Sequence, residues 1–254
     1  MSHKFRLLET GMSTAFMNMG LDEAILESVS SGFSPPTLRF YGWRPKAISI
    51  GYFQGLRDEV DIDACARSGV DIVRRITGGG AVFHDAEVTY SIVFPESHAL
   101  ASASILESYS LICKGIIAGL KRLGIASEFA PINDIVSRGR KISGNAQTRK
   151  MKCILQHGTI LLGVDVETMF GLLRVPKEKA VGKLIEEVKS RVSSVSDILG
   201  RKIEYEEAVP ELRKGFAEAL DLELKTGLAN DREKARAKEL AAAKFSAREW
   251  IFKR

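Results

Sequence analysis

Residues 74–85 read Arg-Arg-Ile-Thr-Gly-Gly-Gly-Ala-Val-Phe-His-Asp, and the rest of the chain can be interpreted outward from this stretch. Strand-forming residues precede and follow the glycine triplet. Three consecutive glycines cost backbone entropy, so they indicate either a tight bend between strands or a loop whose bare N–H groups approach an anion. Arg74 and Arg75 favour the second interpretation, because guanidinium groups bind phosphate and carboxylate. No Gly-Lys-Ser/Thr and no helix follow, so the loop is neither a Walker A motif nor a dinucleotide fingerprint.

The segments on both sides of this loop predict an α+β fold with a mixed, mostly antiparallel sheet flanked by helices. The clearest helix is 103–123, where apolar residues recur at 3.6-residue spacing and Gly124 follows as a C-cap. The strands lie too close together for βαβ crossovers. The predicted strands cover 37–43, 47–53, 70–76, 88–94, 132–136 and 152–162, and the predicted helices cover 14–31, 61–67, 103–123, 166–173, 177–188, 194–199, 207–219 and 231–243.

Composition excludes several classes of protein. The chain has 254 residues with 45% hydrophobic and 27% charged side chains, which suits a single globular domain rather than a disordered or fibrous chain. No apolar run approaches the length of about 18 residues that spans a membrane, and the N-terminus lacks a signal core. The 37 basic and 32 acidic residues give a net charge of +5 that is spread along the chain, which does not predict a nucleic-acid partner. Three separated cysteines fit a reducing, cytoplasmic location.

A second group of candidate site residues lies at 133–147. Lys141 leads into Ser-Gly-Asn and is either an exposed turn lysine or a mobile ammonium that follows charge from a carboxylate onto a phosphate. Asn133 and Asp134 offer the oxygen ligands that Mg²⁺ prefers. His157 shares one strand face with apolar residues, so it is either a core histidine or a pocket residue next to Gly158. His84 adjoins Asp85, but neighbouring strand residues point to opposite faces, so a hydrolase triad is not expected.

Together these segments resemble the lipoate–protein ligase A family, whose relatives include biotin ligases and lipoate or octanoate transferases. The resemblance is collinear and rests on residues 74–85, 133–135, 140–147 and 157–159, with support from 18–24, 38–41 and 49–54. It implies a sheet of the biotin-ligase and class II synthetase type. It also implies that residues 1–254 form one large catalytic domain, helix-rich from about residue 166, and that the small C-terminal domain of the family is absent.

The resemblance implies an ATP-dependent lipoate–protein ligase. ATP and lipoate would give lipoyl-adenylate, and the lipoyl group would then pass to a lysine of a 2-oxoacid dehydrogenase E2 lipoyl domain or of the glycine-cleavage H protein. Lys141 would be the catalytic residue, Arg75 would hold the phosphates, and Asn133 with Asp134 would lie near Mg²⁺. The remaining residues implied to bind ATP or lipoyl-adenylate are Gly79, Gly80, Ala81, Val82, Phe83 and His157.

Two alternatives accompany this interpretation. An octanoyl or lipoyl transferase, or an amidotransferase, would work without ATP through a cysteine thioester, and such relatives place a cysteine in the loop before the lysine motif. Residues 126–140 contain no cysteine, and the strand context of Cys153 predicts a core position, which favours the ligase. A non-catalytic subunit that binds lipoate or a nucleotide is the second alternative, which Lys141, Arg75 and the glycine triplet argue against. Whether lipoate or octanoate is preferred stays open.

The end of the chain carries Trp250 and Phe252, which is unusual because termini tend to be polar. They either pack on their own domain or anchor a partner. The resemblance favours a partner, so we expect a separate small accessory subunit that binds near residues 231–254 and supports activation of lipoate.

Overall fold

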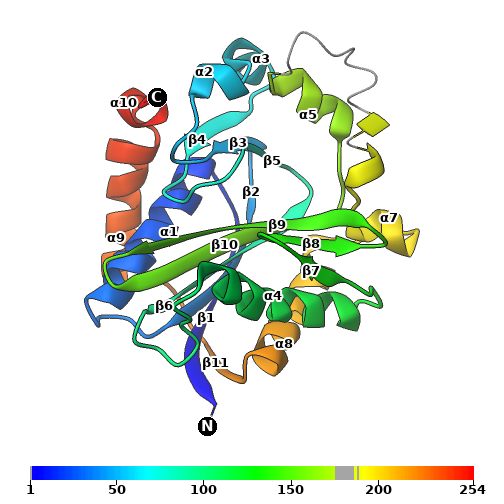
Figure 1. Ribbon diagram of the computed structural model, residues 1–254. Helices are drawn as coiled ribbons and strands as arrows, with labels where there is room; N and C mark the ends of the chain where they lie inside the picture. The colour runs from blue at the N-terminus through cyan, green and yellow to red at the C-terminus, as the bar shows by residue number, and fades with distance from the viewer. Residues whose placement is uncertain (1, 175–185, 188) are drawn as a thin grey trace.

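The computed structural model describes residues 2–174, 186–187 and 189–254 (Figure 1). Most of the helix predicted at 177–188 lies outside the described residues. Within them, no helix is both long and apolar enough to cross a lipid bilayer.

An eight-stranded sheet forms the centre of the molecule, in the order β11-β1-β2-β6-β10-β9-β8-β7. The two pairs that β1 makes, with β11 and with β2, are parallel, and the other five neighbouring pairs are antiparallel. The predicted mixed, mostly antiparallel sheet is therefore confirmed. Its strands are β1 (His3–Ser13), β2 (Thr37–Trp43), β6 (Glu87–Pro95), β7 (Glu128–Ala130), β8 (Asp134–Ser137), β9 (Arg140–Lys150), β10 (Cys153–Leu161) and β11 (Leu222–Thr226).

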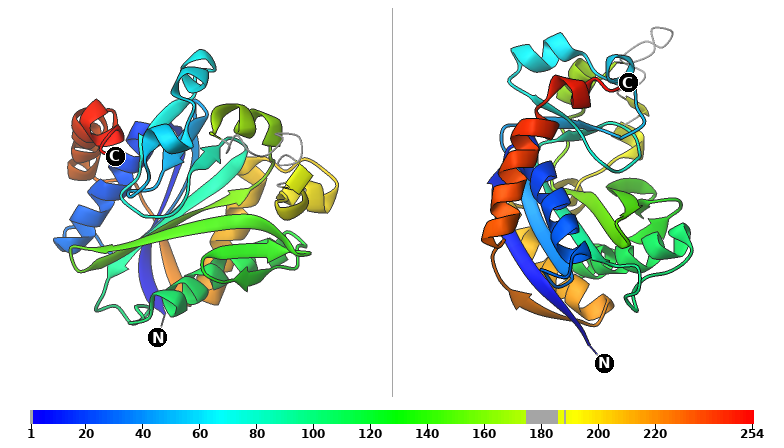
Figure 2. Two further views of the ribbon diagram at one scale, coloured as in Figure 1. Left: turned by 45° about the horizontal axis from the view of Figure 1, so that its top comes forward. Right: turned by 90° about the vertical axis from the view of Figure 1, so that its left-hand side faces the viewer.

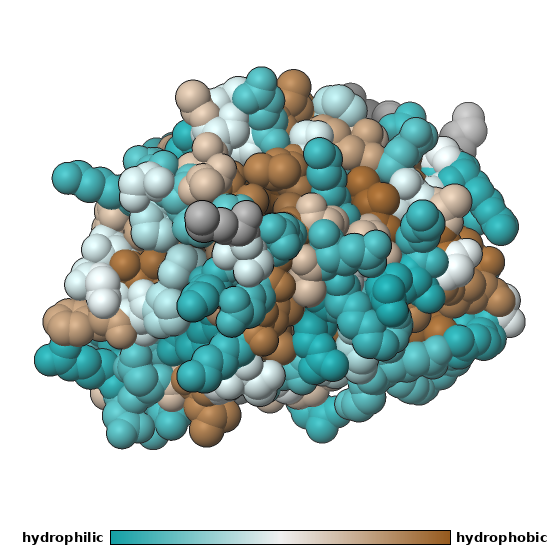
Figure 3. Space-filling view, turned by 90° about the horizontal axis from the view of Figure 1, so that it is seen from below, coloured by the Kyte–Doolittle hydropathy of each residue, from teal (hydrophilic) through white to brown (hydrophobic). Residues whose placement is uncertain are grey.

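Helices cover both faces of this sheet (Figures 1 and 2). On one face lie α4 (Ile105–Arg122) and α8 (Tyr205–Ala219), and on the other α1 (Ala15–Ser30), α9 (Asp231–Leu240) and the π-helix η1 (Ala241–Phe245). The alternation of β2 explains why both faces are apolar, since Phe40 packs toward α4 and α8 while Tyr41 and Trp43 pack toward α1. Seen from the side of β1, β11 and α4, hydrophilic side chains surround smaller apolar areas (Figure 3).

A second, three-stranded sheet carries the glycine triplet. Its order is β4 (Asp71–Arg74), β3 (Ala47–Ile50) and β5 (Val82–His84), so the loop 75–81 joins its two edge strands across the end of β3. A Cβ atom on Gly51, which follows β3, would collide with the carbonyl oxygen of Gly79. The triplet therefore allows two backbones to approach closely. Short helices surround this sheet: α2 (Leu56–Glu59), α3 (Ile62–Arg67), α5 (Val166–Leu172) and α10 (Arg248–Ile251), while α7 (Val195–Leu199) follows in the yellow region of Figure 1.

Five strands of the described structure, β1, β5, β7, β9 and β11, lie outside the predicted strand ranges. The expectation of helices alone after residue 166 is wrong, because β11 lies between α8 and α9 and pairs in parallel with β1. In β11 only Leu222 is fully buried, so its sequence carries little of the period-2 signal of a half-buried strand. In β1 the alternation is broken at the adjacent buried residues Leu7 and Leu8, and the register shifts between Glu9 and Gly11.

Candidate active site

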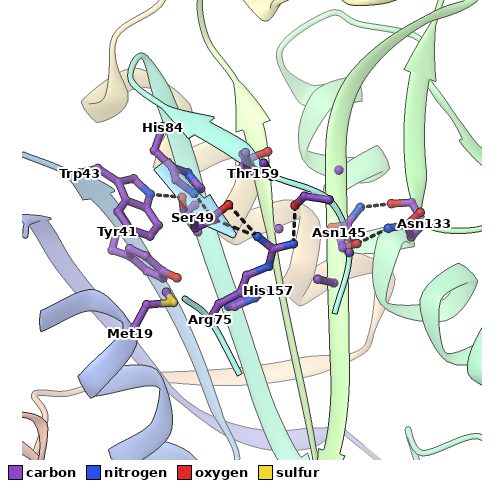
Figure 4. A pocket seen from close by; sticks show the side chains of 18 of the residues that line it. Met19, Tyr41, Trp43, Ser49, Arg75, His84, Asn133, Asn145, His157 and Thr159 are labelled. Atoms are coloured by element: carbon purple, nitrogen blue, oxygen red, sulfur yellow. Dashed lines mark hydrogen bonds between the residues drawn. The ribbon is translucent and has the colours of Figure 1, made fainter. Parts of the chain in front are cut away.

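A pocket with two lobes lies between the glycine loop and the large sheet. Figure 4 shows side chains that line one of them, the Trp43 lobe. The Trp43 lobe is lined by Met19, Tyr41, Trp43, Ser49, Arg75, Gly79, Gly80, Ala81, Val82, His84, Thr89, Asn133, Lys141, Gly144, Asn145, Ala146, His157, Gly158 and Thr159. The Phe83 lobe is lined mainly by apolar side chains, including those of Phe83, Leu161, Val164, Met169 and Val192. Both lobes share Ala81, Val82, Lys141, Gly144 and Thr159, so they adjoin at that wall.

Arg75 braces the glycine loop. Its Nη1 donates to the Ser49 carbonyl at 3.0 Å and to Ser49 Oγ at 3.1 Å, while Nη2 donates to the carbonyls of Gly78 at 2.9 Å and Gly80 at 2.7 Å. Burial lowers the pKa of the guanidinium to about 10, so it stays charged at neutral pH. These contacts give Arg75 a structural task at the pocket, and its predicted contact with phosphate stays a prediction.

Arg74 points the other way and holds the end of the chain. Its fully buried guanidinium donates to the carbonyls of Trp250 and Ile251 and to those of Gly51, Tyr52 and Gln54. The Trp250 indole N–H donates back to the Arg74 carbonyl at 2.8 Å. Trp250 thus packs on its own domain, as one of the two interpretations expected, and the separate accessory subunit stays a prediction.

A buried network centred on Asp22 forms the floor of the Trp43 lobe. Asp22 Oδ1 accepts from Arg39 at 2.8 Å and Ser91 at 2.8 Å, while Oδ2 accepts from the Tyr41 hydroxyl at 2.9 Å. The Nδ1 atom of His157 lies 3.2 Å from the same Oδ2. Burial alone would raise the pKa of Asp22, but the His157 hydrogen bond and the Arg39 charge hold it below its usual value.

His157 is therefore a pocket residue with a defined proton position. Burial lowers its pKa, so the ring is neutral at pH 7. Because the Asp22 carboxylate can only accept, Nδ1 carries the proton and Nε2 accepts from the Thr77 hydroxyl at 2.7 Å. Sequence reasoning missed this network, and the aspartate at position 22 of the predicted amphipathic helix 14–31 was the signal that it carried.

A second buried chain of hydrogen bonds reaches the same lobe from the small sheet. His84 Nε2 lies 2.8 Å from Ser49 Oγ, and His84 Nδ1 lies 2.8 Å from Glu87 Oε1. The Trp43 ring stacks on His84 with 3.9 Å between ring centroids. The carboxylate partner of His84 is thus Glu87, while the adjacent Asp85 forms an ion pair with Lys46 at 2.8 Å. Ser49 and His84 also line the Trp43 lobe, so this chain forms part of the pocket wall.

Lys141 lies on the wall that the two lobes share. It is the second residue of β9, its side chain is 41% exposed, and its Nζ lies 2.7 Å from Asp134 Oδ1 on β8. A Cβ atom on Gly144 would lie 3.0 Å from Lys141 Nζ, so the glycine leaves room for this side chain. Asn145 holds the neighbouring backbone, since its Nδ2 donates to the Asn133 carbonyl at 2.9 Å.

The predicted site residues do come together at this pocket. Phe83 lines the Phe83 lobe, and Asp134 lines neither lobe but contacts Lys141. The others line the Trp43 lobe: Arg75, Gly79, Gly80, Ala81, Val82, Asn133, Lys141 and His157.

Asn133 and Asp134 do not form a magnesium site of their own. The Asp134 carboxylate is paired with the Lys141 ammonium, and the Asn133 amide donates to the Asn145 carbonyl. Within the described ranges no cluster of three or more His, Cys, Asp or Glu side chains could hold a metal ion. These residues therefore do not fit a resident Mg²⁺.

Cys65, Cys113 and Cys153 are all buried, and none of them lines either lobe of the pocket. Burial raises the pKa of each thiol, to about 11 for Cys65 and about 12 for Cys113. Cys153 packs in the core between the sheet and α1, as predicted. A thiolate nucleophile is therefore not available in the pocket.

Comparisons with known proteins agree with the fold and change the functional interpretation. Residues 14–217 match the model of the lipoyl protein ligase A/B catalytic domain. Octanoyltransferase LipM of Geobacillus kaustophilus is 38% identical over 98% of both chains, and LipM of Staphylococcus aureus is 35% identical over 100% of both. The structure from a study of the bipartite lipoate protein ligase of Thermoplasma acidophilum and its E2 lipoyl domain is 30% identical, with a TM-score of 0.87 over 99% of this chain and 96% of that chain. A lipoate–protein ligase A bound with ATP is 28% identical, with a TM-score of 0.83 over 99% of both.

These relatives correct the main expectation from the sequence. The ATP-dependent ligase is contradicted, because relatives at 33–39% identity over nearly the full length are octanoyltransferases. ATP and Mg²⁺ consequently lose their support as cofactors, although one structural neighbour binds ATP. The choice between ligase and transferase had been based on the absence of a cysteine from residues 126–140.

Proposed function

This chain belongs to the lipoyl protein ligase A/B catalytic-domain family, and from that premise we propose that it transfers an octanoyl group from a thioester donor to a lysine amine of a lipoyl domain. The lipoyl domain of a 2-oxoacid dehydrogenase E2 subunit and the glycine-cleavage H protein are the two acceptors that fit this reaction. The lipoyl group, which has the same eight-carbon acyl backbone, is the second candidate for the transferred group, and its rate of transfer can be compared with that of octanoyl.

The position of Lys141 is the observation that carries the proposal. It is the cationic side chain on the wall shared by both lobes, and the Phe83 lobe beside it is lined mainly by apolar side chains. An acyl chain bound along those apolar walls would place its carbonyl beside the ammonium. Attack on that carbonyl creates a negatively charged oxygen, and a positioned cation lowers the barrier by stabilising it.

The described pocket residues support a direct transfer. The acceptor amine attacks the thioester carbonyl and forms the C–N bond, the C–S bond of the resulting tetrahedral intermediate then breaks, and the proton lost by the amine leaves with the thiol. No acyl-enzyme is required, and no thiol lines the described pocket. Holding donor and acceptor together then supplies the rate through proximity and orientation.

The test is a transfer assay with purified protein, octanoyl-pantetheine as the donor, and a lipoyl domain as the acceptor. We expect the mass of an octanoyl group on the acceptor without ATP. Modification that requires free octanoate or lipoate with ATP and Mg²⁺, and does not occur from the thioester, would contradict the proposal.

A second measurement addresses the direct route. Intact-mass analysis during turnover should detect no acyl group on the enzyme, and Cys153→Ala should transfer at the wild-type rate because that thiol lies in the core. A hydroxylamine-labile acyl group on any cysteine would replace direct transfer by a thioester relay.

A further inference from the structure

We propose that a surface of cations and aromatic rings beside the glycine loop docks the acceptor domain through acidic side chains that flank its target lysine. The inference rests on the proposed function, because that function requires the protein to recognise an acceptor domain. We call this the Tyr52 surface, and it consists of Tyr52, Phe53, Lys150, Lys253 and Arg254.

Contacts between these side chains show that the Tyr52 surface is continuous. The ammonium of Lys150 lies 5.1 Å from the Tyr52 ring centroid, and that of Lys253 lies 4.6 Å from it and 2.7 Å from the Tyr52 hydroxyl. Arg254 lies 5.4 Å from the centre of the Phe53 ring. Residues from three distant parts of the sequence thus build one patch.

The charge on this patch is not neutralised by the protein. Lys150, Lys253 and Arg254 are exposed, and within the described residues none of them forms an ion pair. The nearest elements, α2 and α10, carry the acidic residues Asp58, Glu59 and Glu249 alongside the cations Arg57 and Arg248. The pKa of the Tyr52 hydroxyl is lowered by its bond to Lys253 and by the charges of Lys253, Lys150 and Arg254, as expected for a positive potential.

The Tyr52 surface adjoins the pocket. The Tyr52 N–H donates to the Thr77 carbonyl at 2.9 Å, and the Phe53 ring, which is 67% exposed, lies over Gly78. Gly79 and Gly80 of the same loop line the Trp43 lobe. We infer that a protein that inserts a lysine into the pocket beside this loop borders the Tyr52 surface.

The chemistry of the patch favours an acidic protein surface over nucleic acid. Three cations around two rings form a compact site, whereas a phosphate backbone is usually bound along an extended basic stripe. Aromatic and arginine side chains are also enriched where proteins dock on each other. Rim charges of this kind mainly steer association, so they should act on the affinity for the acceptor rather than on the chemical step.

The experiment compares two variants with equal changes in charge. The docking variant carries Lys150→Glu, Lys253→Glu and Arg254→Glu, and the control carries Lys4→Glu, Lys114→Glu and Lys225→Glu. The control lysines are exposed on β1, α4 and β11, and they form no ion pair within the part of the chain that the structure describes. Each variant is assayed with octanoyl-pantetheine and either an acidic lipoyl domain or a small amine.

We expect the docking variant to raise the KM for the lipoyl domain at least tenfold, with transfer to the small amine unchanged and the control close to wild type. Added salt should raise the wild-type KM and leave that of the docking variant unchanged. Replacing the acidic residues that flank the target lysine by lysine should restore transfer by the docking variant.

Three outcomes would overturn the docking proposal. These are an unchanged KM for the docking variant, an equal loss in the control, and loss of small-amine transfer together with acceptor transfer, which would give the patch a role inside the pocket. Tight binding of an oligonucleotide with no change in acceptor KM would assign the patch to nucleic acid instead. If wild-type protein transfers to neither amine, the proposed function fails rather than the docking surface.

Discussion

Asp22→Asn should strongly destabilise the protein while leaving the shape of residue 22 unchanged. The Arg39 guanidinium is buried, and Asp22 supplies the carboxylate that it contacts at 2.8 Å. Asparagine removes the negative charge and places an amide donor where a carboxylate oxygen accepted two hydrogen bonds. Removing one partner of a buried ion pair costs about 3–5 kcal/mol of the free energy of unfolding. That is a large part of the roughly 5–15 kcal/mol that stabilises a typical domain.

The measurement is urea unfolding followed by tryptophan fluorescence, with Asp22→Asn, Arg39→Met and the double variant forming a cycle. The double variant should be less destabilised than the sum of the single variants, because it leaves no unpaired buried charge. Glu211→Gln is the matched control, since Glu211 pairs with Arg122 and Lys214 at the surface and should leave the urea midpoint unchanged.

The same network fixes the behaviour of the protein in acid. The pKa of Asp22 is lowered on folding, so its stabilisation is complete above the unfolded value of 3.8 and is lost as the pH falls through the folded pKa. The Asp22→Asn protein should lack this loss. A destabilisation by Asp22→Asn below about 1 kcal/mol, or additive single variants, would refute the argument that Asp22 compensates a buried charge.

Three further predictions follow from the pocket. Lys141→Ala should reduce the rate of octanoyl transfer about 100- to 1000-fold with an unchanged melting temperature, and a variant that keeps half the wild-type rate would remove Lys141 from the mechanism. Gly51→Ala should lower the free energy of unfolding in urea by about 1–3 kcal/mol, because its Cβ meets the Gly79 carbonyl. Gly80→Ala is the control, because a Cβ at Gly80 has open space and the variant should unfold as wild type does. Equal effects of the two substitutions would contradict the close approach of the two backbones. The pKa of His157 is lowered on folding, so the unfolded state binds more protons below pH 6.5 and the free energy of unfolding should fall there as the pH decreases. His157→Gln should flatten this part of the pH profile. A wild-type urea midpoint that is constant between pH 7.5 and the folded pKa would argue against a neutral buried ring.

Local sequence patterns predicted most of the secondary structure. The strand 37–43 agrees with β2 in both bounds, and α4 ends just before Gly124, whose φ of 85° is the left-handed conformation expected of a C-cap. Such features depend on residues near each other in sequence. The pairing of β1 with β11 joins residues more than 200 positions apart, and neither strand has a strong pattern of its own.

The candidate site was predicted by residue type better than by role. Lys141, Arg75 and His157 do meet at one pocket, as the motifs indicated. Their contacts could not be predicted, because most acceptors of Arg75 are backbone carbonyl groups, which every residue carries. The networks around Asp22 and Glu87 join residues from several strands and helices, so only the three-dimensional structure brings them together.

The consecutive arginines at the end of β4 have a consequence for how the two substrates communicate. Arg74 donates hydrogen bonds to carbonyl groups at 250–251 and at 51–54, a segment that contains two residues of the Tyr52 surface. Arg75 donates hydrogen bonds to carbonyl groups of the glycine loop over the pocket. One peptide unit joins the two residues, so the turn at 250–251 and the glycine loop are both held from the same end of β4. If an acceptor bound at the Tyr52 surface changes the affinity for the donor through this loop, a bound donor must change the affinity for the acceptor by the same factor.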